Sequence, residues 1–241
     1  MSLRVEDDHG VRRLVLDRPD SLNAFDSALY EAVTEAFVEA ASEPAIAVVV
    51  LTGSGRAFSS GADIGELTGA VAPDVVADSF SRFVDALTDF PKPLLCAVNG
   101  LAVGVGATLL AHADLVFMSA TARLCCPFTS LGLVPEAGSS FLYPWLVGPQ
   151  EAAWAMLSGE WLDAADCLRI GLAWKVVDPE DLDEVVGAHA RRLASQPVEA
   201  LVATKRLLRA SVADLARAAT ARETTALRPL LNKLHETRSC V

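Results

Sequence analysis

The sequence predicts an α/β fold, in which one core of alternating helices and strands is followed by a helical C-terminal region. Two strongly apolar runs, 45–51 and 94–98, each follow a segment with helical spacing, and this alternation is typical of right-handed βαβ crossovers. From residue 139 onward most segments have helical spacing instead. No repeat, low-complexity tract or linker divides the 241 residues, so we expect one continuous domain.

Composition limits the classes of function. A hydrophobic content of 52% with 21% charged residues predicts a globular protein with a sizeable core. The net charge of −11 argues against a nucleic-acid partner. No apolar window is long enough to span a membrane, and the first ten residues lack the apolar segment of a signal peptide, so we expect a cytoplasmic protein without membrane association. The five cysteines include no Cys-x-x-Cys pair, which predicts reduced, packed thiols.

The chain begins with a predicted hairpin and helix. Residues 2–6 and 11–17 alternate in hydropathy around a His-Gly turn, as the two strands of a hairpin do. Residues 28–42 have helical spacing, and Asp26 or Ser27 is placed to cap the N-terminus of that helix.

The next segment alternates between strand, loop and helix. The run 45–51 predicts a strand that is buried on both faces. Residues 52–64 are rich in glycine and serine, which predicts a loop that can approach a ligand closely. A mobile segment, 69–73, precedes a helix at about 74–89.

The central stretch, 93–138, contains the first indication of chemistry. Its strand at 94–98 leads to Gly104-Val105-Gly106, where a small-residue helix begins, and a second strand follows at 114–119. Backbone N–H groups at a helix start form a ready anion site. Glu136 is a lone carboxylate in an otherwise apolar, glycine-bracketed turn, so we interpret the stretch as an oxyanion site beside one acid.

The C-terminal part is predicted to be helical, with Val176-Val177 as its one strand. Its prolines, Pro179, Pro197 and Pro229, are interpreted as helix starts or breaks.

Several common motifs are incomplete. Leu109 stands where a dinucleotide-binding motif needs its third glycine, and the Gly53–Ser60 segment lacks the lysine of a phosphate-binding loop. No Gly-x-Ser-x-Gly elbow occurs, which lowers the case for a serine hydrolase. The four histidines have no metal-ligand spacing with one another, so we expect no metal site. We also expect no separate cofactor. We interpret His112 as a hydrogen-bonded structural residue or a charge at a helix C-terminus.

Several ordered segments resemble the crotonase superfamily, which comprises the enoyl-CoA hydratases and isomerases. The resemblance reaches from the N-terminus to about residue 178, and its segments are Arg18-Pro19 with Leu22-Asn23-Ala24, then Ala57–Ile64, Ala97–Gly106, Asp114 and Leu131–Gly138. It implies a crotonase-like spiral of αββ units over residues 1–195 and a C-terminal helical oligomerisation region over 196–241. It also implies acyl-CoA thioester substrates, with coenzyme A as part of the substrate, and assembly as a homotrimer or a dimer of trimers.

By the resemblance, two backbone N–H groups hold the thioester oxygen, and they belong to Ala62 and Val105. Val105 replaces the usual middle glycine, a change that leaves the peptide N–H in place. Removing an α-proton from a thioester builds negative charge on this oxygen, so fixed donors stabilise the enolate more than the ground state.

The departures from the family pattern favour one reaction. Hydratases of this family activate water with two glutamates, whose positions here hold Thr108 and Phe128. Glu136 remains, in a segment that resembles the Δ3,Δ2-enoyl-CoA isomerases, which carry their single base at this position. One carboxylate in an apolar pocket can move a proton from C2 to C4, and burial raises its pKa toward neutrality. We therefore predict an isomerase with Glu136 as its base.

The remaining predicted site residues contact substrate or support the donor loop; they are Ala24, Ser60, Gly61, Asp63, Ile64, Gly104, Thr108 and Phe128. We interpret Asp63 chiefly as a support for the Ala62 donor.

Alternatives remain open at this stage. They include a hydratase-like or other crotonase reaction and a non-catalytic acyl-CoA-binding relative. Hydrolysis with Glu136 as nucleophile is disfavoured because no histidine lies between Gly61 and Gly100 to activate water. Other acids are candidate bases of lower rank, namely Asp74, Asp78 and Asp85.

Overall fold

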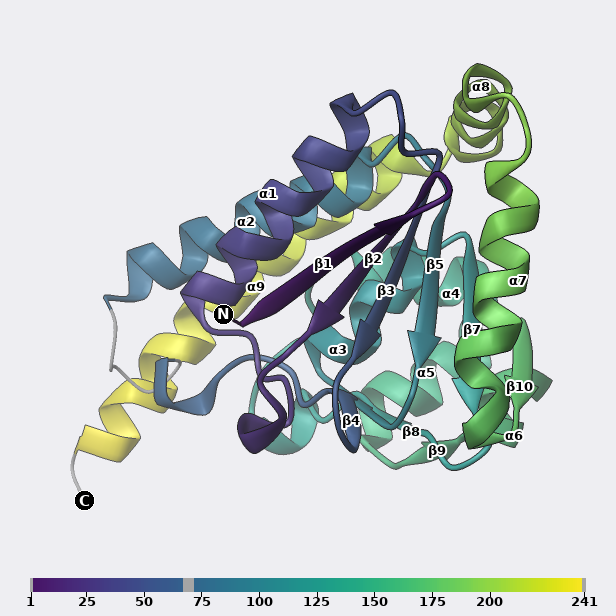
Figure 1. Cartoon of the computed structure of the whole chain (residues 1–241). Coiled ribbons are helices and arrows are strands. Elements are labelled where there is room, and N and C mark those ends of the chain that lie inside the picture. The colour runs from purple at the N-terminus through teal and green to yellow at the C-terminus, as the bar shows by residue number, and fades with distance from the viewer. Residues whose placement is uncertain (1, 67–71, 240–241) are drawn as a thin grey trace.

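The computed structural model describes residues 2–66 and 72–239 and contains two β-sheets (Figure 1). The larger sheet has the order β1-β2-β3-β5-β7-β10, in which β1 and β2 form an antiparallel hairpin and the other neighbours are parallel. Its strands are β1 (Leu3–Asp8), β2 (Val11–Leu16), β3 (Val48–Gly53), β5 (Leu94–Val98), β7 (Leu115–Ser119) and β10 (Lys175–Val177). The predicted hairpin and parallel crossovers are confirmed.

A second, smaller sheet has the order β4-β6-β8-β9. Its strands are β4 (Ala57–Ser59), β6 (Leu101–Val103), β8 (Arg123–Cys125) and β9 (Leu162–Asp163). The prediction that 52–64 is entirely loop is therefore wrong, as is the prediction of a single late strand. Strands of two or three residues are too short to show a hydropathy period, so the sequence pattern does not predict them.

Each strand of the larger sheet from β3 to β7 is followed by a strand of the smaller sheet, which makes a repeated αββ unit. The preceding helices are α1 (Ser27–Ser42), α2 (Pro73–Asp89) and the short pair α3 (Val105–Thr108) and η3 (Leu109–His112). Asp26 caps α1 by accepting a hydrogen bond from the Leu29 N–H, as predicted. The predicted mobile segment at 69–73 lies mainly outside the described residues.

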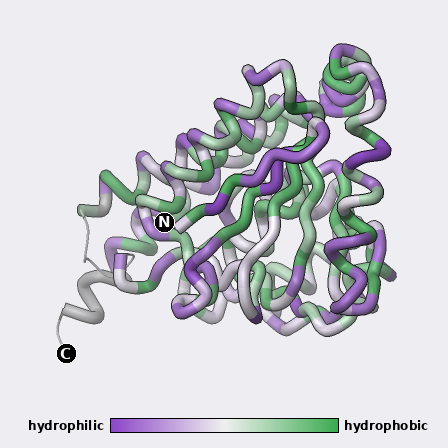
Figure 2. The backbone as a smooth tube through the Cα atoms, in the orientation of Figure 1, coloured by the Kyte–Doolittle hydropathy of each residue, from purple (hydrophilic) through white to green (hydrophobic). Residues whose placement is uncertain are grey.

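Helices cover both faces of the larger sheet. Because side chains alternate along a strand, Val49 and Leu51 of β3 pack into the main core, whereas Val48 and Val50 pack toward α7 (Leu182–Ala194). Helices α1, α2 and α9 (Ala213–Ser239) lie together on the side opposite α7 (Figure 1). Figure 2 shows hydrophilic and hydrophobic residues alternating along these outer helices, as expected for helices with one buried face.

The remaining helices are α4 (Ser139–Val147), α5 (Pro149–Ser158), α6 (Ala164–Arg169) and α8 (Val198–Arg209). Pro229 lies inside α9, so its interpretation as a helix start or break is wrong. Four cysteines are free and buried as predicted, and Cys240 lies outside the described residues. Across residues 2–66 and 72–239, every helix is too short or too polar to cross a lipid bilayer.

Candidate active site

Two glycine turns bring the two sheets' connecting loops into backbone contact. A Cβ atom on Gly61 would lie 2.8 Å from the carbonyl oxygen of Val103 and 3.6 Å from the Cα of Gly104. Gly61 and Gly104 both have positive φ, 96° and 54°. Only glycine combines this conformation with such a close approach, so these two positions fix how near the loops can come.

The residues that follow these glycines carry the two predicted N–H donors. Ala62 lies opposite Phe25 in an isolated parallel β-bridge. The hydrogen bonds of this bridge join Phe25 to Gly61 and to Asp63, so the Ala62 N–H takes no part in them. Val105 is the first residue of α3, where the helix leaves the N–H without an intrahelical acceptor. Within residues 2–66 and 72–239, neither N–H donates a hydrogen bond to the protein. The pair of free donors on adjoining segments suits an anion.

Glu136 is a buried carboxyl group, and its side chain has one hydrogen-bonding side-chain partner in the part of the chain that the structure describes. Glu136 is 9% exposed to solvent, and its Oε1 accepts a hydrogen bond of 2.6 Å from the Thr108 Oγ1. Burial is the main reason why the pKa of Glu136 is raised to about 8. The Thr108 hydrogen bond lowers this pKa, and the charge of Glu223 raises it. A carboxyl group with this pKa is suited to exchange protons near neutral pH.

The turn that carries Glu136 is held in an uncommon conformation. Ala137 has a φ of 59°, in the left-handed region, and its carbonyl oxygen lies 2.8 Å from the Nε2 of the buried His112. Burial lowers the pKa of His112 to about 4, so the ring is neutral and donates its Nε2–H to this carbonyl. The Ser139 hydroxyl closes the turn by donating to the Glu136 carbonyl oxygen at 2.6 Å. His112 is thus a hydrogen-bonded structural residue, as predicted.

Helix α9 supplies the remaining contacts to this turn. Glu223 is 6% exposed, and its two carboxylate oxygens accept hydrogen bonds of 2.7 Å from the N–H groups of Gly138 and Ser140. These N–H groups lie at the start of α4, which has no side-chain cap of its own. Glu223 is not among the predicted site residues, because nothing in the local sequence pattern relates it to a turn 85 positions away.

The two positions that the resemblance assigns to water-activating glutamates contain no carboxylate. Thr108 is fully buried and hydrogen-bonded to Glu136, and Phe128 is 6% exposed. Thr108 therefore contacts the predicted base, Glu136, a relation that no sequence pattern indicated. The pKa of Tyr30 is raised mainly by burial and further by the charges of Glu136 and Glu66, so Tyr30 also lies near Glu136.

The other predicted residues lie around the donor loop. The Asp63 carboxylate is 3.4 Å from the Arg18 guanidinium and accepts a hydrogen bond from the Gly65 N–H, so Asp63 braces this loop. The Ser60 hydroxyl donates to the Ser21 carbonyl oxygen at 3.2 Å. Ile64 is 68% exposed and Ala24 is buried. The lower-ranked candidate bases Asp74, Asp78 and Asp85 are all exposed, unlike Glu136.

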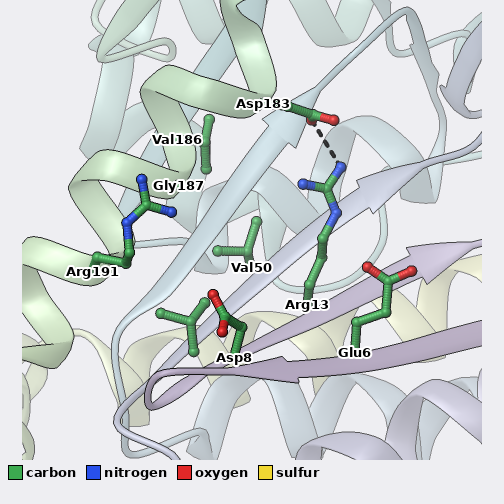
Figure 3. A pocket seen from close by; sticks show the side chains of 9 residues that line it. Glu6, Asp8, Arg13, Val50, Asp183, Val186, Gly187 and Arg191 are labelled. Atoms are coloured by element: carbon green, nitrogen blue, oxygen red, sulfur yellow. Dashed lines mark hydrogen bonds and ion pairs between the residues drawn. The ribbon is translucent and has the colours of Figure 1, made fainter.

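A cavity elsewhere in the fold contains none of the predicted site residues. Figure 3 shows this cavity between α7 and the strands β1 to β3. Arg13 and Asp183 form an ion pair across it, and Arg191 lies at its side. Among the described residues, no group of three or more His, Cys, Asp or Glu side chains is arranged to hold a metal ion.

The αββ spiral, the two free N–H donors and the buried carboxyl group define a crotonase-type protein. The sequence matches the family model described as enoyl-CoA hydratase/isomerase over residues 6–240. The chain therefore belongs to the enoyl-CoA hydratase/isomerase family of the crotonase superfamily, which processes acyl-CoA thioesters.

Similar proteins have both isomerase and hydratase names. The chain is 36% identical to the 1,2-epoxyphenylacetyl-CoA isomerase of Escherichia coli (strain K12), over 78% of this chain and 74% of that protein. It is 32% identical to the enoyl-CoA delta isomerase 2 of Rattus norvegicus, over 93% of this chain and 58% of that protein. The crystal structure of an enoyl-CoA hydratase from Mycobacterium marinum superposes with a TM-score of 0.82 at 50% identity, covering 86% of this chain and 99% of that one.

Proposed function

We propose that the protein is an enoyl-CoA isomerase that moves a double bond from Δ3 to Δ2 of an acyl-CoA thioester. The observation that carries this proposal is the buried carboxyl group of Glu136, whose pKa is raised to about 8. The family's two water-activating positions hold Thr108 and Phe128. Isomerisation needs one group that takes and returns a proton and no activated water, which suits this set of residues.

The proposed reaction has two proton transfers. The Glu136 carboxylate takes the proton from C2, and the electrons of that C–H bond move toward the thioester carbonyl to form an enolate. The N–H groups of Ala62 and Val105 hold the enolate oxygen, where one such donor is worth roughly 3 kcal/mol of barrier. Glu136 then returns the proton to C4, where the electrons of the old C3–C4 double bond form the new C4–H bond. The enolate oxygen re-forms the thioester carbonyl, and the electrons of the C1–C2 double bond of the enolate form the new C2–C3 double bond.

The experiment uses the wild-type protein and two substrates. With a 3-enoyl-CoA, we expect the absorbance of the conjugated 2-enoyl thioester to appear without any change of mass. With a 2-enoyl-CoA, we expect no product that has gained the mass of one water. Efficient hydration together with absent isomerisation would contradict the proposal and favour a hydratase-like reaction.

A second candidate reaction follows from one relative. The similarity to a 1,2-epoxyphenylacetyl-CoA isomerase favours testing an epoxide thioester of an aromatic acid beside the enoyl substrates. Tight acyl-CoA binding without turnover of any of these thioesters would instead favour a non-catalytic binding protein.

We also propose a cytoplasmic homotrimer or dimer of trimers. The region from α4 to β9 supports an oligomer because it exposes Trp145, Trp154 and Trp161 by 50%, 54% and 42%. Sedimentation velocity measures the assembly, and a monomer at micromolar concentration would contradict this proposal.

A further inference from the structure

The turn that carries Glu136 depends on a residue from the far end of the chain. Glu223 accepts two hydrogen bonds of 2.7 Å from the backbone of this turn, one to each carboxylate oxygen. Charge-assisted hydrogen bonds of this kind are short and strong, and a bidentate pair fixes orientation as well as distance.

The backbone of α9 lies against the same turn. A Cβ atom on Gly138 would lie 3.2 Å from both the Ala216 carbonyl oxygen and the Thr220 hydroxyl oxygen. Gly138 has a φ of 73°, so the turn uses a glycine where α9 comes close. Together with Glu223, these contacts span successive turns of α9, and they make the position of Glu136 depend on the docking of this helix.

The charge of Glu223 distinguishes it from the other titratable groups near the base. Those groups come from four further elements, and they are Tyr30 on α1, His112 on η3, Cys126 after β8 and Tyr143 on α4. Burial raises the pKa of both tyrosines and of the Cys126 thiol, and it lowers the pKa of His112, so all four are neutral near pH 7.

Three more charged groups lie beyond His112. Lys205 and Arg209 face Asp114, at 2.7 Å and 4.0 Å, and neither cation is among the groups that shift the pKa of Glu136. Among the described residues, Glu223 is therefore the charged group that acts on Glu136.

Resting on the proposed role of Glu136, we propose that Glu223 is a positioning residue with two effects. Its carboxylate orients the turn so that the Glu136 side chain meets Thr108, and its negative charge increases the proton affinity of the base. A base that must return the same proton to carbon works best when it holds that proton near neutral pH. Glu223 thereby acts on the reaction through Glu136 and its turn.

The test compares three variants of residues on α9. Glu223→Gln removes the charge and keeps one acceptor oxygen, whereas Glu223→Asp keeps the charge on a shorter side chain. Asp214→Asn is the matched control, because it removes a carboxylate from the same helix at a site that is 89% exposed and paired with Arg217. Thermal unfolding confirms that each variant is folded.

The primary measurement is the ¹³C NMR titration of the Glu136 carboxyl group, assigned by its loss in Glu136→Gln. We expect Glu223→Gln to lower the pKa of Glu136 by on the order of one unit and to shift the rising limb of the kcat/KM profile to lower pH by a similar amount. Asp214→Asn should leave both values at those of the wild type. An unchanged Glu136 titration in Glu223→Gln would overturn the proposal.

Glu223→Asp tests the positioning effect, also if the glutamine variant does not fold. We expect a Glu136 titration close to that of the wild type with kcat reduced several-fold, and an unchanged kcat would contradict positioning. The NMR titration needs no turnover, so the two proposals fail separately. A lowered Glu136 pKa in a protein that isomerises no enoyl-CoA would refute the proposed function alone.

Discussion

The Thr108 hydroxyl donates a hydrogen bond of 2.6 Å to the Glu136 carboxyl group, across 28 positions of the chain. Thr108 stands at a position that the resemblance assigns to a glutamate of the hydratases. A second carboxylate at this distance would repel Glu136, whereas the hydroxyl stabilises its ionised form. The position therefore contains no acid and holds a hydrogen-bond partner of Glu136, the proposed base.

Loss of this hydroxyl is expected to make Glu136 a weaker acid. A hydrogen bond to a charged group contributes roughly 1.5–3 kcal/mol, so Thr108→Val should raise the pKa of Glu136 by about one to two units. The rising limb of kcat/KM should move to higher pH, with about a tenfold loss at pH 7. Thr108→Ser keeps the hydroxyl and serves as control. The prediction fails if the valine and serine variants have the same pH profile.

The Val105 donor can be removed without a change of backbone direction. Val105 begins α3, a position where proline is tolerated, and proline lacks the N–H. Val105→Pro should reduce kcat by roughly 10²–10³-fold, the usual effect of losing one oxyanion donor.

Val105→Ala is the control, because it also shortens the buried side chain but keeps the N–H. Initial rates with a 3-enoyl-CoA provide the measurement. Equal rates for the two variants would exclude this N–H as a donor.

Close contact between the glycine loops predicts a second effect. In Gly61→Ala, the new Cβ would meet the Val103 carbonyl oxygen at 2.8 Å, so the loops must separate. We expect a loss of about 1–3 kcal/mol in the free energy of unfolding together with a lower kcat.

Gly171→Ala is the control that has the backbone strain of an added Cβ but not the steric contact. Gly171 has a similar φ of 85°, and no atom lies within 4 Å of the added Cβ. Urea unfolding and steady-state kinetics compare the two variants. Similar kcat values would show that the approach of the loops does not position the donors.

Burial of Glu136 should cost stability at high pH. Its pKa is about 8 in the folded protein against an ordinary value of 4.5, so the folded state binds more protons between these values. Stability must then fall as pH rises from about 4.5 to 8, since protons stabilise the state that binds them more tightly.

Glu136→Gln removes this titration. The gain in melting temperature over the wild type should be small near pH 4.5 and should grow as pH rises toward 8. Differential scanning calorimetry across this range provides the measurement, and a gain that does not change with pH would contradict a raised pKa.

Five strands of the larger sheet could be predicted because they are five or six residues long, which is enough to show a pattern. Continuous apolar runs such as 45–51 and 94–98 mark strands that are buried on both faces, and they correspond to β3 and β5. The strands of the smaller sheet are only two or three residues long, which is too short to show a hydropathy period.

The candidate site divides in the same way. Ala62, Val105 and Glu136 lie within ordered local motifs, so the sequence suffices to locate them. The roles of His112, Thr108 and Glu223 depend on hydrogen bonds across 25, 28 and 85 positions. Such contacts follow from the packing of helices, which a single sequence does not specify residue by residue.

The most direct test of the central claim is the rate at which Glu136→Gln converts a 3-enoyl-CoA to a 2-enoyl-CoA. Glutamine keeps the size of the side chain and an acceptor for Thr108 but takes up no proton from C2. We predict a loss of roughly 10²–10⁴-fold in kcat with acyl-CoA binding retained. A variant that keeps the wild-type rate would show that another group moves the proton, and would contradict the assignment of Glu136 as the base.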